Sequence, residues 1–216
     1  MGKLSDEWRT PDDLFQVLDR GGEYMGMTFA GFNFDIDLCA NHENHKVDLY
    51  CTQYLTNYMC YGKSCINFQE YVKRNNLTCF MNPPYSNPKP FIEKAWEDSK
   101  HCKIVCLVKC DPSTKWWATF WDYSQNKYEF KIQCYKCDGY KDLNIFNVYA
   151  SYRKCHICDG KGYLIETKKY KIGSKPGCEV IFFPKRIQFD PPPGYTGKVS
   201  SPSFPSAIVI MDRREL

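Results

Sequence analysis

A near-continuous apolar run in the middle of the chain, residues 103–108 with the sequence KIVCLV, most constrains its fold. A strand that is apolar at consecutive positions must be covered on both faces, as strands in parallel sheets are. A second short apolar strand, residues 77–81, precedes it, and the segments that follow the two strands have helical periodicity. Strands that alternate with helices predict an α/β fold with a mixed, mostly parallel sheet and helices on both faces.

Local signals predict further elements. Thr10 can serve as the N-cap of a first helix, with Pro11 at its first helical position. Two more helices are expected, at 90–99 and 113–121, and three more strands, at 32–38, 180–183 and 207–211. Residues 124–176 interrupt the alternation. We therefore expect one α/β domain, made of residues 1–123 and 177–216, with a small inserted subdomain at 124–176.

Length and composition limit the class of protein. The 216 residues are 43% hydrophobic, which is typical of a folded globular chain. The sequence contains neither an apolar stretch of ~18 residues nor an apolar signal region at its N-terminus, so we expect a cytoplasmic protein that does not contact membranes. The formal net charge of +4 does not by itself indicate a nucleic-acid partner. The charge is uneven, because residues 124–176 contain ten Lys and one Arg against five acids.

The strand that ends at Met81 is followed directly by Asn82-Pro83-Pro84-Tyr85, and proline cannot continue a central strand. Ligands of open α/β sheets bind beyond the carboxyl ends of the strands, so the tetrapeptide lies where a site is expected. The alternative is a proline-rich turn without a function. This tetrapeptide would arise by chance in a chain of this size on the order of once in a thousand cases, which favours the functional interpretation.

These residue types suit an exocyclic amine on a nucleobase. Such an amine is a poor nucleophile because its lone pair is delocalised into the ring. The side-chain oxygen of Asn82 and the carbonyl of Pro83 could each accept a hydrogen bond from one N–H of the amine and so favour a tetrahedral nitrogen. The rigid prolines would fix this array, and Tyr85 offers a flat face for a base taken out of its stack.

Two acids, Asp35 and Asp37, end the predicted strand at 32–38. Acids at strand ends commonly receive the ribose hydroxyls of nucleotide-type cofactors, so we favour a ligand role for Asp37. The alternative is that both acids cap the end of the strand. A glycine-rich cofactor loop of the FxGxG type is absent, and residues 35–40 stand in its place.

The chain resembles the phage-type, Dam-like family of DNA N6-adenine methyltransferases. The matching pieces occur in family order and are Asp6-Glu7-Trp8-Arg9-Thr10-Pro11 with Leu14-Phe15, Asp37-Leu38-Cys39-Ala40, Asn44-His45-Lys46, Tyr50, Asn82-Pro83-Pro84-Tyr85, Lys94-Ala95, Leu107 with Trp116, Arg186-Ile187-Gln188-Phe189 and Pro205-Ser206-Ala207-Ile208-Val209.

The resemblance implies a Rossmann-like methyltransferase fold, S-adenosylmethionine as the methyl donor, and adenine in DNA, flipped from its stack, as the acceptor. It implies that Asn82, Pro83, Pro84 and Tyr85 form the catalytic segment. The cofactor would be held by Thr10, Pro11, Asp35, Asp37 and Asn82. A phage or prophage gene that protects DNA from restriction is expected.

Four cysteines form a separate pattern. Cys134 and Cys137 make one Cys-x2-Cys knuckle, Cys155 and Cys158 make another, and seventeen residues separate the two. Each knuckle is followed by Asp-Gly, which supplies a tight turn, and the spacing predicts a four-thiolate zinc ribbon. Four thiolates leave no open coordination position, so the zinc would be structural. Two roles stay open: an extended DNA-binding surface and a staple for the insertion. The other cysteines are expected to be reduced thiols in the core.

The sequence also allows comparison with three alternatives to DNA adenine methylation. A related tetrapeptide can serve another acceptor, namely cytosine N4, RNA adenine or a glutamine side chain. The missing glycine-rich loop also allows a catalytically silent nucleic-acid-binding adaptor. A zinc deaminase is disfavoured because the chain contains no His-x-Glu.

Overall fold

The computed structural model describes residues 8–61, 64–73, 75–123, 127–133, 157–159, 161, 163–169, 173–199 and 202–216. The chain forms two compact units. The first comprises Met1–Asp122 and Ser174–Leu216, and the second comprises Tyr123–Gly173. No helix in the described part of the chain has both the length and the apolar character needed to cross a membrane.

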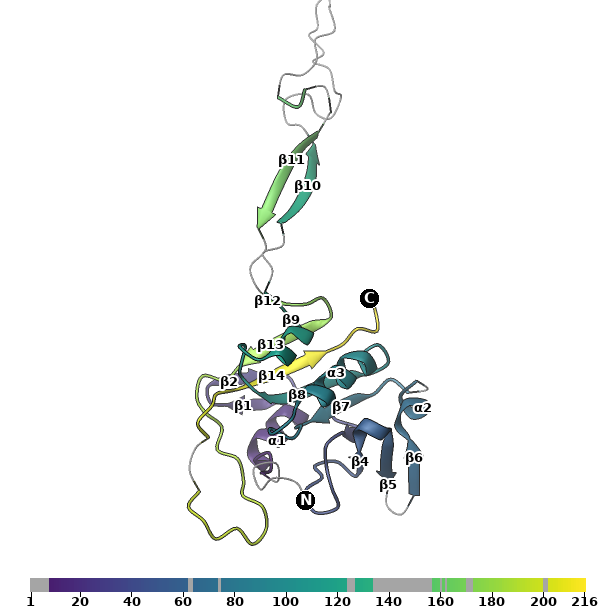
Figure 1. Cartoon of the computed structure of the whole chain (residues 1–216), viewed down its shortest axis with the longest axis vertical. Helices are drawn as coiled ribbons and strands as arrows, with labels where there is room; N and C mark the ends of the chain where they lie inside the picture. The colour runs from purple at the N-terminus through teal and green to yellow at the C-terminus, as the bar shows by residue number, and fades with distance from the viewer. Residues whose placement is uncertain are drawn as a thin grey trace, which may run out of the picture. The chain divides into compact units, whose positions relative to one another are not determined.

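An eight-stranded sheet forms the centre of the first unit, with the strand order β13-β14-β8-β7-β3-β4-β5-β6 (Figure 1). Its strands are β3 (Ile36–Asp37), β4 (Leu49–Gln53), β5 (Tyr58–Tyr61), β6 (Ser64–Asn67), β7 (Thr78–Met81), β8 (Lys103–Lys109), β13 (Cys178–Phe182) and β14 (Ser206–Met211). Strands β8, β7, β3 and β4 are parallel to one another.

The prediction of an α/β fold with a mixed sheet is confirmed, but the expectation of a mostly parallel sheet was wrong. Among the described residues, four of the seven strand pairings in this sheet are antiparallel. They involve β5 and β6 at one edge and β13 and β14 at the other. Short connections join β4, β5 and β6, and a parallel pair would require a crossover of a dozen or more residues.

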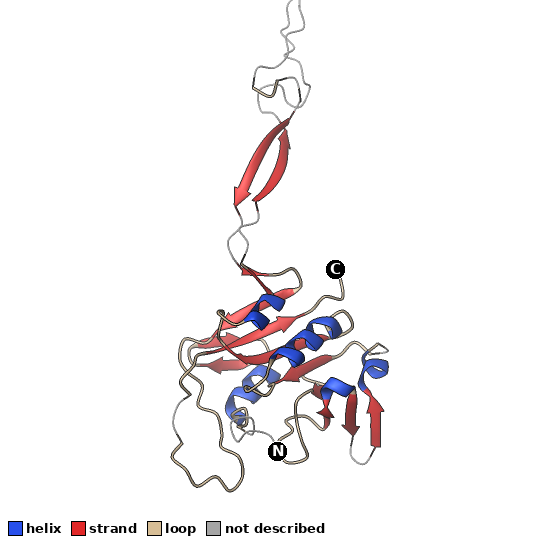
Figure 2. Ribbon diagram, in the orientation of Figure 1, coloured by secondary structure: helices blue, strands red, loops and turns tan. Residues whose placement is uncertain are grey.

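Helices cover both faces of the sheet, as predicted (Figure 2). Helix α1 (Asp12–Arg20) buries Leu14, Phe15 and Leu18 in a cluster with Phe80, Val105 and Leu107. Helix α3 (Lys89–Asp98) and the 3₁₀ helix η3 (Lys115–Thr119) share the other cluster with Met81, Cys106 and Val108. Neighbouring strand residues face opposite sides of a sheet, so β7 and β8 supply both clusters. The 3₁₀ helix η2 (Tyr54–Thr56) and helix α2 (Phe68–Val72) lie between β4 and β7 in the sequence.

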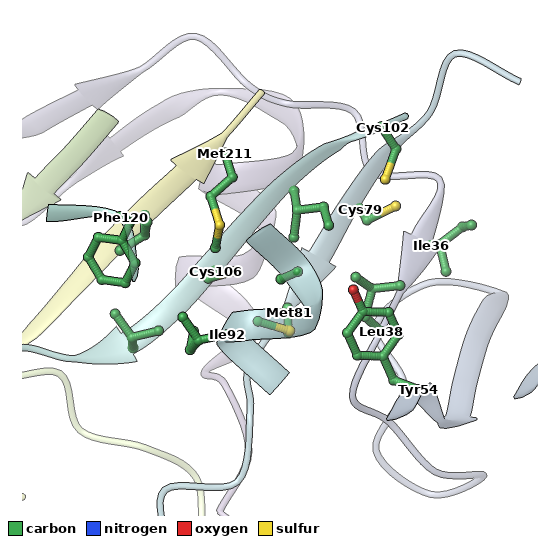
Figure 3. Close-up of a cluster of buried hydrophobic side chains, with 14 of the residues drawn as sticks. Ile36, Leu38, Tyr54, Cys79, Met81, Ile92, Cys102, Cys106, Phe120 and Met211 are labelled. Atoms are coloured by element: carbon green, nitrogen blue, oxygen red, sulfur yellow. The ribbon is translucent and has the colours of Figure 1, made fainter. Parts of the chain in front are cut away.

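The second of these clusters contains the buried thiols (Figure 3). Cys79, Cys102 and Cys106 are free cysteines with exposed fractions of 0%. Burial raises the pKa of the Cys79 and Cys106 thiols well above the usual range, which keeps them protonated. They therefore pack as small apolar side chains, in agreement with the prediction of reduced core thiols.

Three local predictions were wrong. The strand expected at 32–38 is reduced to β3, because Asn33 has a left-handed φ of 54° and its N–H donates to the carbonyl of Asp19. Thr10 is not an N-cap, because α1 begins at Asp12 and Pro11 precedes it with an extended ψ of 140°. The helix expected at 113–121 is only the short η3.

A hairpin that the sequence did not predict follows α1. It pairs β1 (Gly22–Tyr24) with β2 (Met27–Phe29). The chain then returns past the end of α1 at Gly31, where an added Cβ would lie 2.6 Å from the carbonyl carbon of Arg20. Only glycine fits this crossing, which leads the chain into β3.

The second unit contains a long antiparallel pair, β10 (Lys127–Gln133) with β11 (Tyr163–Lys169). Strands β9 (Trp121–Asp122) and β12 (Gly173–Ser174) form a separate two-stranded sheet. Residues 143–149, with the sequence LNIFNVY, favour a further strand, but they lie outside the described residues.

Candidate active site

The tetrapeptide Asn82–Tyr85 follows β7 directly, at the carboxyl ends of the parallel strands. The amide of Leu38, just after β3, donates to the carbonyl of Phe80 at 2.8 Å. Asp37 is the register partner of Phe80, so Asn82 lies two residues beyond that pair on the neighbouring strand. The structure therefore brings Asp37 and Asn82 together at the carboxyl ends of two neighbouring strands, as the strand-end rule predicted.

Alternate residues of the tetrapeptide line two different cavities. Asn82 and Pro84 line a cavity of ≈ 470 Å³, the first cavity. Pro83 and Tyr85 line another of ≈ 300 Å³, the second cavity. Successive residues of an extended segment point to opposite sides, so the tetrapeptide forms a wall between the two. Groups bound in the two cavities could meet at this wall.

The first cavity is bounded by the loop after β3, by β4 and η2, and by the start of α3. Two asparagines shape the loop: Oδ1 of Asn41 accepts from the amides of Glu43 and Asn44 at 2.8 and 3.0 Å, and Oδ1 of Asn44 accepts from the amide of Asn41 at 2.6 Å. These bonds fold a tight turn without glycine. The other lining residues are Leu38, Cys39, Ala40, Cys51, Thr52, Gln53, Tyr54, Leu55, Thr56 and Phe91.

Asp37 is hydrogen-bonded to both ends of this loop. Its side chain is 3% exposed, and its two oxygens accept hydrogen bonds from the amides of Cys39 at 3.3 Å and Lys46 at 3.0 Å. Asp37 therefore makes the contacts that are expected of an acid that caps the end of a strand. Burial raises the pKa of Asp37 to about 6, although the two amides act in the opposite direction.

The raised pKa gives a pH dependence of stability. Between about pH 4 and pH 6 the folded state binds the Asp37 proton more tightly than the unfolded state, so the free energy of unfolding should fall by about 3 kcal/mol as the pH rises through this window. Asp37→Asn removes the titration. Urea unfolding of both proteins across pH 4–7 measures this difference. A gap between wild type and variant that does not change with pH would contradict the assignment.

The other predicted cofactor residues are placed differently. Asp35 accepts a hydrogen bond from the amide of Thr78 at 2.8 Å, at the amino end of β7, so the structure does not bring it to Asn82. Thr10 and Pro11 are buried and do not occur among the described residues that line either cavity. They precede Asp12, whose ion pair with Lys46 links the start of α1 to the loop after β3 and lowers the pKa of Asp12.

Asn82 carries an unused hydrogen-bond acceptor. Its side-chain oxygen is buried and has no partner among the described residues. A buried acceptor without a donor costs about 1–3 kcal/mol, and native proteins contain few of them. Such a group fits a site where a ligand supplies the donor.

Tyr85 is held by two aromatic neighbours. Its ring packs edge-to-face against Phe189 and Phe204, with centroid distances of 5.5 and 5.3 Å. Its hydroxyl is also buried and without a partner among the described residues, and burial raises its pKa far above the usual range. The tyrosine therefore contributes a neutral ring in a fixed position to the second cavity.

Sequence reasoning missed a polar group beside the second cavity. Lys109, at the end of β8, lies 3.1 Å from Asp111, which also accepts from the hydroxyl of Ser113 at 2.6 Å. The Ser113 and Lys109 hydrogen bonds lower the pKa of Asp111. The strand-end rule applied to residues 103–108 would have found these side chains. The other lining residues are Ser86, Asn87, Pro88, Lys89, Val108, Thr114 and Trp116.

No group of three or more His, Cys, Asp or Glu side chains in the described ranges is placed to hold a metal ion. Three of the four predicted zinc ligands, Cys134, Cys137 and Cys155, lie outside these ranges. Cys158 is described and is buried, 4% exposed. It lies in a tight turn in which Asp159 has a φ of 51° and the amide of Lys161 donates to the Cys158 carbonyl at 3.0 Å.

Comparison with known proteins gives one family. Residues 2–127 match the family model described as DNA N-6-adenine-methyltransferase (Dam). The chain is 32% identical over 120 residues to the DNA N-6-adenine-methyltransferase of Haemophilus phage HP1 (strain HP1c1), which covers 51% of this chain and 54% of that protein. It is 29% identical over 190 residues to the protein of the same description from Escherichia phage T1, which covers 86% of this chain and 65% of that protein. The chain thus spans between half and two thirds of these relatives. No solved structure matches it.

Proposed function

Because the chain belongs to the DNA N-6-adenine-methyltransferase (Dam) family, we propose that it transfers a methyl group from S-adenosylmethionine to the N6 amine of adenine in DNA. The observation that carries the proposal is the side-chain oxygen of Asn82, which lies between two cavities and has no partner among the residues that the structure describes. Both named relatives are phage proteins, which favours a phage or prophage origin and action on DNA in the host cytoplasm.

We place the methyl donor in the first cavity. It would be held by the turn at Asn41 and Asn44 and by the apolar side chains of Leu38 and Phe91. Asp37 would keep the loop in place through its hydrogen bond with the amide of Lys46. S-adenosylmethionine supplies a methyl group bound to a sulfonium, which leaves as a neutral thioether when the methyl group is transferred. The chain's part is therefore to align donor and acceptor and to stabilise charge on the amine.

The adenine is proposed to enter the second cavity, after leaving its stack, and to lie against Tyr85. The side-chain oxygen of Asn82 and the carbonyl of Pro83 would each accept a hydrogen bond from one N–H of the amine, and Pro84 keeps the segment rigid. The amine nitrogen would then direct its lone pair past the Asn82 side chain toward the methyl group in the first cavity, and the methylated amine would release one proton to solvent.

Calorimetric titration with S-adenosylmethionine tests this proposal against its main rival. A methyltransferase should bind one molecule per chain, whereas a silent nucleic-acid adaptor should bind none. Cytosine N4 and RNA adenine remain alternative acceptors, and identification of the methylated nucleoside separates them from DNA adenine.

We further propose that residues 124–176 form an inserted zinc ribbon within a methyltransferase domain made of residues 1–123 and 177–216. The cysteine spacing supports four thiolate ligands, and the buried Cys158 in its tight turn fits one of them. Elemental analysis should find one zinc ion per chain. The variant C134S/C137S should lose it, and the control C110S/C178S should keep it. Equal zinc content in the two variants would refute the ribbon.

A further inference from the structure

A long loop connects β13 to β14 (Figure 1). Phe189 near its start and Phe204 near its end both contact the Tyr85 ring. Lys109 lies over the Phe204 ring, 5.5 Å from its centroid, and the amide of Cys110 donates to the carbonyl of Pro205 at 2.8 Å. Both ends of the loop are therefore anchored beside the second cavity.

Six cations lie on this loop and on the segments that line the second cavity. We call them the cationic rim: Lys89, Lys109, Lys115, Lys185, Arg186 and Lys198. Segments 85–89, 109–116 and 184–199, which carry the rim, contain only two acids, Asp111 and Asp190, and have a net charge of +4. The whole chain also has a net charge of +4. Residues 124–176 contribute +6, so the rest of the chain, including the rim, has a net charge of −2. The rim is therefore a positive region on an otherwise acidic domain.

Among the described residues, most of this charge is not neutralised. Lys109 is paired with Asp111, and Lys89 lies 3.7 Å from Glu93. The other four cations have exposed side chains and form no ion pair with the described residues. Exposed, unpaired cations on segments that line a cavity or are anchored beside it raise the local concentration of an anionic ligand.

We propose that the cationic rim binds the sugar–phosphate backbone of the DNA that flanks the base in the second cavity. The inference rests on the proposed function and extends it by assigning the DNA-contacting surface to the β13–β14 loop and to the edge of the second cavity. Each cation that neutralises a phosphate releases a condensed counterion, so binding through the rim must weaken steeply with salt.

Two charge-matched variants test the assignment. K185Q/R186Q/K198Q removes the three rim cations on the loop. The control K73Q/K100Q/K103Q removes three cations that follow α2, follow α3 and begin β8, at the amino ends of the parallel strands. Fluorescence anisotropy with duplex DNA between 50 and 200 mM salt should show that the rim variant binds on the order of 10-fold or more weakly. The slope of log K against log salt should flatten by roughly 2–3, because each lost phosphate contact contributes about 0.9.

The control variant should bind like wild type, and all three proteins should have the same melting temperature and the same affinity for S-adenosylmethionine. Equal losses in both variants would mean that only overall charge matters and would overturn the inference, as would an unchanged slope in the rim variant or no DNA binding by wild type. DNA binding that depends on the rim, without formation of N6-methyladenine, would instead overturn the proposed activity alone.

Discussion

Replacing Asn82 with alanine is expected to lower kcat by about 10²- to 10³-fold, the range found when one preorganised hydrogen-bonding group is removed from a transition state. The side-chain oxygen of Asn82 is buried and has no partner in the described part of the chain, so its removal costs the folded protein little. Thermal stability and affinity for S-adenosylmethionine should therefore remain close to those of wild type. Single-turnover methylation of duplex DNA, together with calorimetry, measures both quantities.

Two further variants separate hydrogen bonding from an unspecific effect. Asn82→Asp keeps an acceptor oxygen in place and should retain more activity than Asn82→Ala. Asn75→Ala removes an exposed side chain that donates to the Tyr71 carbonyl, on the segment that leads into β7, and should not change the rate. An Asn82→Ala protein that methylates DNA as fast as wild type would refute the catalytic role.

Replacing Asp98 with alanine is expected to lower the free energy of unfolding by about 3–5 kcal/mol, because it leaves a partly buried cation without its partner. Asp98 is 3% exposed and accepts hydrogen bonds from the Tyr54 hydroxyl at 2.7 Å and from Lys94 Nζ at 2.6 Å. The Lys94 side chain is only 14% exposed, and its Nζ lies 4.6 Å from the Tyr54 ring centroid. Urea denaturation measures the loss.

The double variant K94M/D98L is the matched control for this pair. It replaces both charges with apolar groups, so it should be considerably more stable than Asp98→Ala. Tyr54 lines the first cavity, and its loosening in Asp98→Ala should also weaken the binding of S-adenosylmethionine. Equal losses of stability in the single and double variants would show that side-chain packing, and not the unpaired charge, dominates.

The sequence predicted the strands whose pattern depends on burial alone. Strands β7 and β8 are apolar at consecutive positions, and burial of both faces requires that pattern. It did not predict β4, β5 and β6, where polar residues are mixed with tyrosines and cysteines near the edge of the sheet. Nor does apolar content give strand direction, which depends on how the chain returns. Both β13 and β14 were predicted as strands, but their antiparallel direction was missed for this reason.

The positions of the candidate site residues could be predicted where they depend on the end of a strand. They could not be predicted where they depend on pairing with distant segments. The position of Asn82 follows directly from the end of β7. For Asp37, the sequence could not distinguish a cofactor hydroxyl from the amides of its own loop, because both are donors near the same carboxylate. Thr10 is a residue type that is common at N-caps. However, the neighbouring Arg9 forms a β-bridge with Asp190, far along the chain, and the helix begins only at Asp12.

The most direct test of the proposed activity is mass spectrometry of nucleosides from DNA incubated with the protein and methyl-labelled S-adenosylmethionine. The proposal predicts labelled N6-methyladenine with the wild-type protein and a loss of that product with Asn82→Ala. Label found only in N4-methylcytosine, no labelled nucleoside at all, or equal N6-methyladenine from wild type and variant would contradict it.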